Sequence, residues 1–77
     1  MKYYIDTIEQ VTKDGELAEY GGREKVGDET SALSKFYKKL SDVSADIGKN
    51  HLYMDIKITN SEGGIIKKDQ VGVYQNE

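Results

Sequence analysis

Few residues in this chain could carry out acid–base or nucleophilic chemistry. His51 is the single histidine, and there is no cysteine to act as a nucleophile. The segment HLYMDIKIT, residues 51–59, alternates apolar even positions with polar odd positions, so we expect His51 on the solvent side of a strand. A hydrolytic triad needs a histidine that an acid orients and that faces a serine, and no spacing in the sequence provides one. We therefore expect no catalytic residue and no enzyme activity.

Two acidic turns and a glycine pair contain the residue types of known binding motifs. The calcium-loop pattern fails around Gly15, because its closing position holds Gly21 instead of glutamate, and it fails around Gly63, because its first position holds Ile58. The Gly21-Gly22 pair fits neither the dinucleotide fingerprint nor the P-loop. Without cysteine, the chain has no disulfide and no thiolate-bound zinc or iron–sulfur site. The sequence thus predicts no metal, no cofactor and no evident small-molecule substrate.

The basic residues bear on a nucleic-acid partner. The net charge is −3, and Arg23 is the only arginine among eleven basic residues, whereas nucleic-acid-binding domains usually carry a basic excess and use arginine. Asp42 and Asp46 share the outer face of the predicted helix with its lysines, so a solvated face with ion pairs is the simpler interpretation. Nucleic acid is therefore the alternative partner, and the side chains that would contact it are Lys35, Lys38, Lys39, Lys67 and Lys68.

Six tyrosines are many for 77 residues. Tyrosine is enriched at protein interfaces, because it brings a large contact area and a polar tip. Cross-strand packing and the stacking of single-stranded bases are the alternatives. We expect a protein partner or a homodimer, bound through an open sheet face or a sheet edge. The candidate contact residues on the open face are Tyr4, Tyr20, Tyr53 and Tyr74.

The first half of the chain predicts a hairpin. Residues 3–11, YYIDTIEQV, favour a strand over a helix, although the apolar phase requires either a bulge or partial cover on both faces. Asp14-Gly15 is a strong hairpin turn signal, and residues 16–20 form the returning strand. Gly21-Gly22 is expected to end that strand, and residues 23–28 to form a polar connection.

The second half predicts a helix and two further strands. An apolar stripe of Leu33, Phe36, Tyr37, Leu40, Val43 and Ile47 indicates a helix at about 29–47, with Asp28 as N-cap and Gly48 after its last turn. Residues 51–59 form a central strand whose even positions face the helix, and NSEGG forms a turn. IIKK and QVGVY form one bent strand or two short ones. The prediction is a single α+β domain over 1–77, ordered ββαββ, with one amphipathic helix packed on one face of a largely antiparallel sheet.

Two further expectations concern location and origin. No apolar run precedes the first acidic residues, and none reaches the roughly 20 residues of a membrane span, so we expect no membrane contact and a cytoplasmic location. The segments MKYYIDTIEQVT and NHLYMDIKITNSEGGIIKKDQVG, in a chain rich in Lys, Ile and Tyr and free of Pro, resemble short uncharacterised proteins of conjugative transposons and other mobile elements of low-GC Gram-positive bacteria. That resemblance implies an accessory or regulatory role in a bacterial cytoplasm and no assigned site residues.

Overall fold

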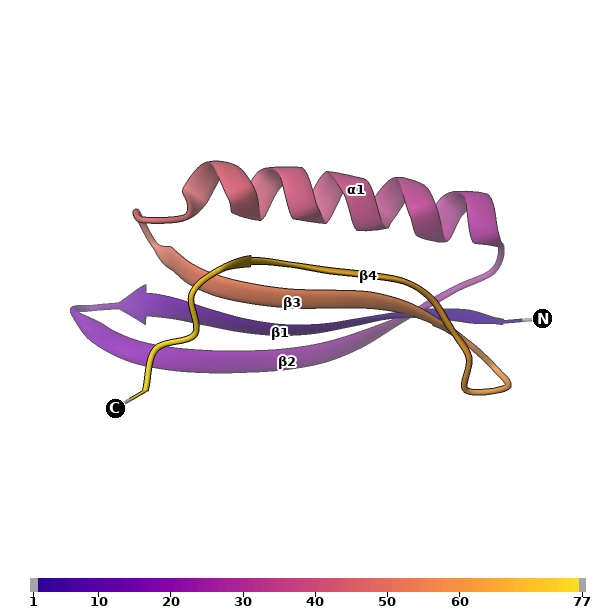
Figure 1. Cartoon of the computed structure of the whole chain (residues 1–77), viewed down its shortest axis with the longest axis horizontal. Helices are drawn as coiled ribbons and strands as arrows, with labels where there is room; N and C mark the ends of the chain where they lie inside the picture. The colour runs from indigo at the N-terminus through magenta and orange to yellow at the C-terminus, as the bar shows by residue number, and fades with distance from the viewer. Residues whose placement is uncertain (1, 77) are drawn as a thin grey trace.

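The computed structural model describes residues 2–76, which form one antiparallel sheet and one helix. The strand order is β2-β1-β3-β4, and the helix lies along one face of the sheet (Figure 1). This is the predicted ββαββ order, and β3 is the central strand that the alternation of residues 51–59 predicted. The elements are β1 (Tyr3–Lys13), β2 (Glu16–Val26), α1 (Glu29–Asp46), β3 (His51–Asn60) and β4 (Ile65–Gly72). The helix among these residues does not combine the length and the apolar character that crossing a membrane requires.

β1 and β2 form a hairpin that is longer than predicted. Asp14 and Gly15 both have positive φ, 53° and 80°, as the tight two-residue turn requires. The ladder then continues without interruption until Tyr3 lies opposite Val26. The prediction that Gly21-Gly22 ends the second strand is therefore wrong. A glycine costs a strand only about 0.5–1 kcal/mol, which the paired residues on both sides outweigh.

The helix begins where the sequence predicted. The Asp28 carboxylate accepts a hydrogen bond from the backbone N–H of Ser31 at 2.8 Å, which satisfies one of the free amides of the first turn. That bond and the hydrogen bond from the Ser31 hydroxyl lower the pKa of Asp28. The last helical residue is Asp46, one residue earlier than predicted, and Gly48 adopts the expected positive φ of 85°.

The core lies between α1 and the sheet. The even positions of β3 are fully buried at Met54, Ile56 and Ile58, as predicted. Phe36 of the helix stripe is also fully buried, whereas Tyr37 is 50% exposed, so its assignment to the core is wrong. The remaining buried apolar side chains are Ile5, Val26, Ala32 and Val43, with Leu33, Leu40 and Ile47 packed at the margin.

The last strand is continuous and carries a bulge. β4 pairs with β3 throughout, but the register shifts where Ile58 lies opposite Lys67 and Thr59 lies opposite Ile65. IIKK and the first part of QVGVY are therefore one bulged strand. Gly72, with φ 79°, ends the strand. The prediction that Tyr74 lies on a strand is therefore wrong.

A second bulge moves His51 away from the open face. β1 and β3 pair in register up to Gln10 and Tyr53, after which Val11 lies opposite His51 and Leu52 is the extra residue. His51 therefore lies on the helix side of the sheet, where 22% of its side chain is exposed. The prediction of a solvent-facing histidine is wrong, because strict alternation fails at the extra residue.

Candidate protein-contact site

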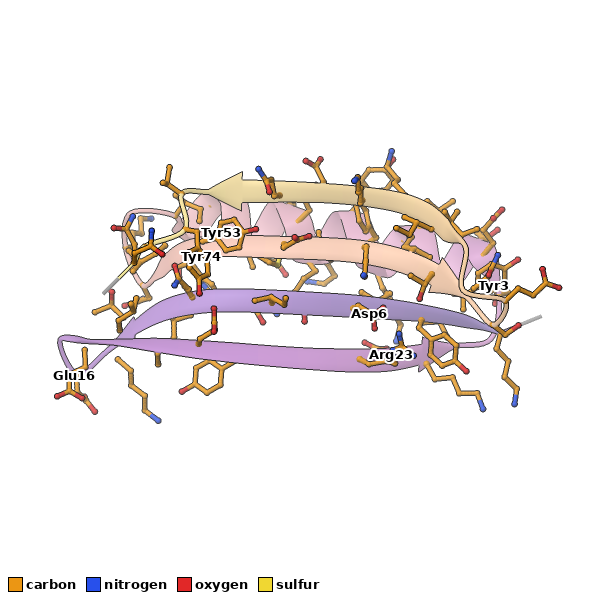
Figure 2. The ribbon with its side chains drawn as sticks, turned by 60° about the horizontal axis from the view of Figure 1, so that its bottom comes forward. Tyr3, Asp6, Glu16, Arg23, Tyr53 and Tyr74 are labelled. Carbon is orange, nitrogen blue, oxygen red and sulfur yellow. The ribbon has the colours of Figure 1, made fainter. Side chains whose placement is uncertain are left out.

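Two of the four candidate tyrosines lie together on the open face of the sheet. The rings of Tyr53 and Tyr74 meet edge to face, with centroids 5.4 Å apart (Figure 2). The Tyr74 hydroxyl donates a hydrogen bond to Glu19 on β2 at 2.8 Å. That hydrogen bond raises the pKa of Tyr74, and burial raises the pKa of Tyr53. The pair thus packs the end of the chain onto the sheet.

The C-terminal segment, residues 73–76, crosses the open face from β4 toward β2 (Figure 1). Gln10 of β1 fixes it through two hydrogen bonds to the backbone of Gln75: Nε2 donates to the carbonyl oxygen at 2.9 Å, and Oε1 accepts from the N–H at 2.7 Å. Gln10 is only 2% exposed as a result. One end of the open face is therefore covered by the chain itself.

The other end of the open face carries a charge network. Arg23 of β2 donates to both carboxylate oxygens of Asp6, at 2.6 and 3.1 Å, and the Thr59 hydroxyl donates to the same group at 3.2 Å. The Arg23 hydrogen bond lowers the pKa of Asp6. The same guanidinium lies 4.7 Å from the centre of the Tyr4 ring. Tyr4 therefore belongs to an ionic cluster that is separate from Tyr53. Figure 2 shows Asp6 and Arg23 of this cluster at the opposite end of the sheet from Tyr53.

Tyr20 lies on the opposite face. It pairs with Glu9, whose carboxylate contacts Lys39 of the helix at 3.2 Å, so both strand residues face the helix side. Tyr20 is 49% exposed there. The four candidate tyrosines therefore form no single patch.

The lysines of the nucleic-acid alternative also lie apart. In α1, Lys35 pairs with Glu24 of β2, Lys38 with Asp42 at 2.9 Å, and Lys39 with Glu9. On β4, Lys67 lies 5.5 Å from the Tyr37 ring on the helix side, whereas the adjacent Lys68 faces the other way, opposite Lys57. The helix lysines are each matched by a carboxylate, and those of β4 point to different faces.

His51 connects three elements. Its Nδ1 lies 2.7 Å from the Asp46 carboxylate at the end of α1, and its Nε2 lies 3.1 Å from Glu9 on β1. The hydrogen bond with His51 lowers the pKa of Asp46. Lys39 contacts the same Glu9 oxygen, so the cluster contains a lysine ammonium as well as the two carboxylates. These contacts join the C-terminal end of the helix to the sheet.

The outer strand β2 exposes a row of backbone groups. It is hydrogen-bonded to β1 on one side only and is eleven residues long. The two-residue turn makes Lys13 and Glu16 the hydrogen-bonded pair beside it, and bonded pairs then alternate along the ladder. The N–H and C=O groups of the odd residues therefore point outward, at Leu17, Glu19, Gly21, Arg23 and Lys25.

Gly21 and Gly22 leave the middle of this edge bare. Neither has a positive φ, and an added Cβ would meet only Thr7 atoms, at 3.5 and 3.9 Å, which are ordinary contacts. Their own chain thus gives no steric reason for glycine at either position. Such glycines in a strand often mark the close approach of another backbone.

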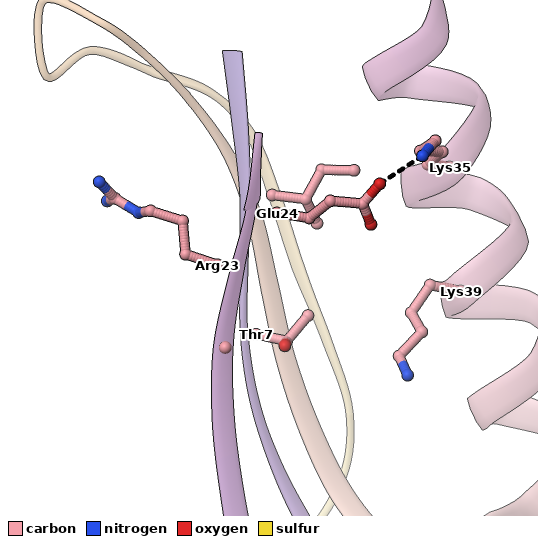
Figure 3. A pocket seen from close by; sticks show the side chains of 7 residues that line it. Thr7, Arg23, Glu24, Lys35 and Lys39 are labelled. Carbon is pink, nitrogen blue, oxygen red and sulfur yellow. Dashed lines mark hydrogen bonds and ion pairs between the residues drawn. The ribbon is translucent and has the colours of Figure 1, made fainter. Parts of the chain in front are cut away.

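A groove of about 310 Å³ adjoins Gly22 on the helix side (Figure 3). Its floor includes Ile5 and Thr7 of β1, and Lys35 and Lys39 of α1 form its far wall. The figure shows Glu24 pointing into this space toward Lys35, while Arg23 points to the opposite face. The groove exists because the helix lies over the central strands and leaves the helix side of β2 partly uncovered.

The sequence alone predicts a contact at an open sheet face or a sheet edge but does not identify the β2 edge, because a glycine pair is expected to end a strand. One signal could have found it. A two-residue turn at Asp14-Gly15 pairs residues whose numbers add to 29, and this places the apolar Val26 opposite Tyr3 at the far end. The apolar character of Val26 therefore indicates that the strand continues beyond Gly22.

Comparison with known proteins finds no match for this chain, whether to a family model, a curated protein or a solved structure.

Proposed function

We propose that this chain is a small, non-enzymatic accessory or regulatory domain that acts by protein contact through the open edge of β2. One observation carries the proposal: an eleven-residue outer strand whose centre, Gly21-Gly22, has no side chain and no internal reason to lack one. Unpaired strand edges bind extended segments through backbone hydrogen bonds, and flanking side chains set the specificity. An accessory role in a bacterial cytoplasm accords with the resemblance to mobile-element proteins.

The edge is a better contact site than the tyrosines of the open face. Tyr53 and Tyr74 pack against each other, and the Tyr74 hydroxyl is bonded to Glu19. Tyr4 stacks with Arg23. These side chains already have partners within the chain, whereas the outward groups of β2 have none among the described strands.

The nucleic-acid alternative gains no support from the side chains it requires. Steep, salt-dependent binding needs several cations on one surface. Here the helix lysines have carboxylate partners, and Lys67 and Lys68 face opposite sides of the sheet.

The test is an affinity capture from bacterial extract that compares the wild-type chain with Gly21→Pro. Proline removes the outward N–H of residue 21 and is tolerated on an edge strand whose N–H faces solvent. Bound proteins, including further copies of the chain, should be lost with Gly21→Pro and kept with Tyr53→Ala as the open-face control. Retention of every bound protein by Gly21→Pro, with circular dichroism unchanged, would overturn the proposal.

A further inference from the structure

We infer that the partner at the β2 edge is a second copy of this chain, paired antiparallel with β2 so that Gly21 lies opposite Gly21 of the other copy. This inference rests on the proposed function and names its partner. A twofold axis perpendicular to the sheet would join two four-stranded sheets into one of eight strands, with both helices on the same side.

The register follows from the length and the hydrogen bonding of β2. Under such an axis, directly opposite residues of the two copies have their side chains on the same face of the sheet. Because side chains alternate between faces along β2, two residues on the same face are both odd or both even in number, and the two numbers add to an even sum. A sum of 42 centres the pairing on Gly21 and uses all eleven residues, from Glu16 to Val26. The odd residues point their N–H and C=O groups at one another in this register, which gives about ten backbone hydrogen bonds.

The side chains of this register are complementary. Glu19 lies opposite Arg23 of the other copy on the open face, twice by symmetry, and no like charges lie directly opposite each other. On the helix side, Tyr20 lies opposite Gly22. Its half-exposed ring would cover the bare backbone of that glycine and border the groove beside it. The dimer therefore explains both the glycine pair and the exposure of Tyr20.

The other outer strand resists the same pairing. A twofold axis near the middle of β4 would place either Lys68 opposite Lys68 or Asp69 opposite Asp69. A charged residue at the centre of an edge strand is a known protection against edge-to-edge association. Self-association is thus directed to β2.

Single cysteines test the register cleanly, because the chain contains none. Directly opposite residues of a hydrogen-bonded pair have Cα atoms about 5.5 Å apart, within disulfide range, whereas a shift of two residues places them about 7–8 Å apart. Under mild oxidation, Gly21→Cys should form a disulfide-linked dimer at least tenfold faster than Gly22→Cys. Glu62→Cys, in the exposed β3–β4 turn, measures the rate of chance collision.

Light scattering of the unmodified protein completes the test. The wild type should be dimeric at high concentration, and Gly21→Pro should be monomeric with unchanged circular dichroism. A monomeric wild type, or equal cross-linking rates for Gly21→Cys and Glu62→Cys, would overturn the inference. Faster cross-linking of Gly22→Cys would also overturn it, because it indicates an axis at residue 22. If the affinity capture still depends on Gly21, the proposed edge contact stands with another partner; if it does not, both proposals fail.

Discussion

At the residue scale, Gly72 controls the path of the C-terminus. Its φ of 79° turns the chain from β4 onto the open face, and the N–H of Val73 then donates to the Leu52 carbonyl at 3.1 Å. A Cβ at this position would collide with the same carbonyl oxygen. Only glycine meets both the conformational and the steric requirement here.

We expect Gly72→Ala to release residues 73–76 and to lower the free energy of unfolding by about 2 kcal/mol or more. Tyrosine fluorescence and urea denaturation measure the two effects. Gly63→Ala is the matched control, because Gly63 has a similar φ of 86° but nothing within 4 Å of the added Cβ. It should cost about 1 kcal/mol of backbone strain alone. Equal losses for both variants would show that the Leu52 contact does not matter.

A second residue-scale prediction concerns Asp6. The Arg23 hydrogen bond holds the pKa of Asp6 below its ordinary value, so the ion pair adds stability above pH 4 that is lost as pH falls through the lowered pKa. We expect Asp6→Asn to be less stable than wild type at pH 7, by up to about 1 kcal/mol because Arg23 is largely exposed. In urea titrations, the difference in the free energy of unfolding should shrink as the pH is lowered below 3.8, the ordinary pKa of an Asp side chain. Glu62→Gln, in an exposed turn, is the control for removal of one carboxylate. A constant Asp6→Asn deficit across the pH range would contradict the assignment.

At the element scale, the helix depends on a narrow stripe. Phe36 is fully buried, whereas its neighbour Tyr37 is half exposed and touches it edge to face, with ring centroids 5.3 Å apart. We expect Phe36→Ala to cost about 3–5 kcal/mol and Tyr37→Ala about 1 kcal/mol or less, measured by urea denaturation. A larger loss in the free energy of unfolding for Tyr37→Ala than for Phe36→Ala would show that the helix is rotated about its axis, with Tyr37 facing the core.

The elements that local patterns predicted are those where one physical requirement dominates. The Asp14-Gly15 turn, the Asp28 cap and the alternation of 54–58 each follow from turn geometry, capping or burial. The failures lie where pairing with a distant strand decides. Glycine has a low intrinsic preference for strands, so the local sequence predicts that β2 ends at Gly21-Gly22. The two glycines nevertheless remain in β2 because both are paired with residues of β1.

The candidate site was harder to predict than the fold for the same reason. His51 changes face because Leu52 is an extra residue opposite β1, and the sequence of β3 alone carries no sign of that bulge. Tyr20 falls on the helix side because of its register with Glu9. The open-face assignment of four tyrosines required knowledge of strand register, which depends on contacts between segments.

At the scale of the whole molecule, a 77-residue chain buries a limited core, so any further surface it covers adds visibly to its stability. Dimerisation along β2 would pair the longest free edge and cover the groove beside Gly22. Stability then becomes a function of protein concentration, because the dimer unfolds to two separate chains.

We therefore expect the Tm of the wild type to rise by about 5 °C or more over a hundredfold increase in protein concentration that spans dimer formation. A tenfold increase in concentration stabilises the folded dimer by about 0.7 kcal/mol per chain. A stabilisation of 1 kcal/mol raises the Tm of such a domain by roughly 4–8 °C. Differential scanning calorimetry measures the shift. Gly21→Pro should keep one Tm at every concentration, because it lacks the central edge N–H while its pairing with β1 is intact. A wild-type Tm that is equally constant would mean that this edge is unpaired in solution.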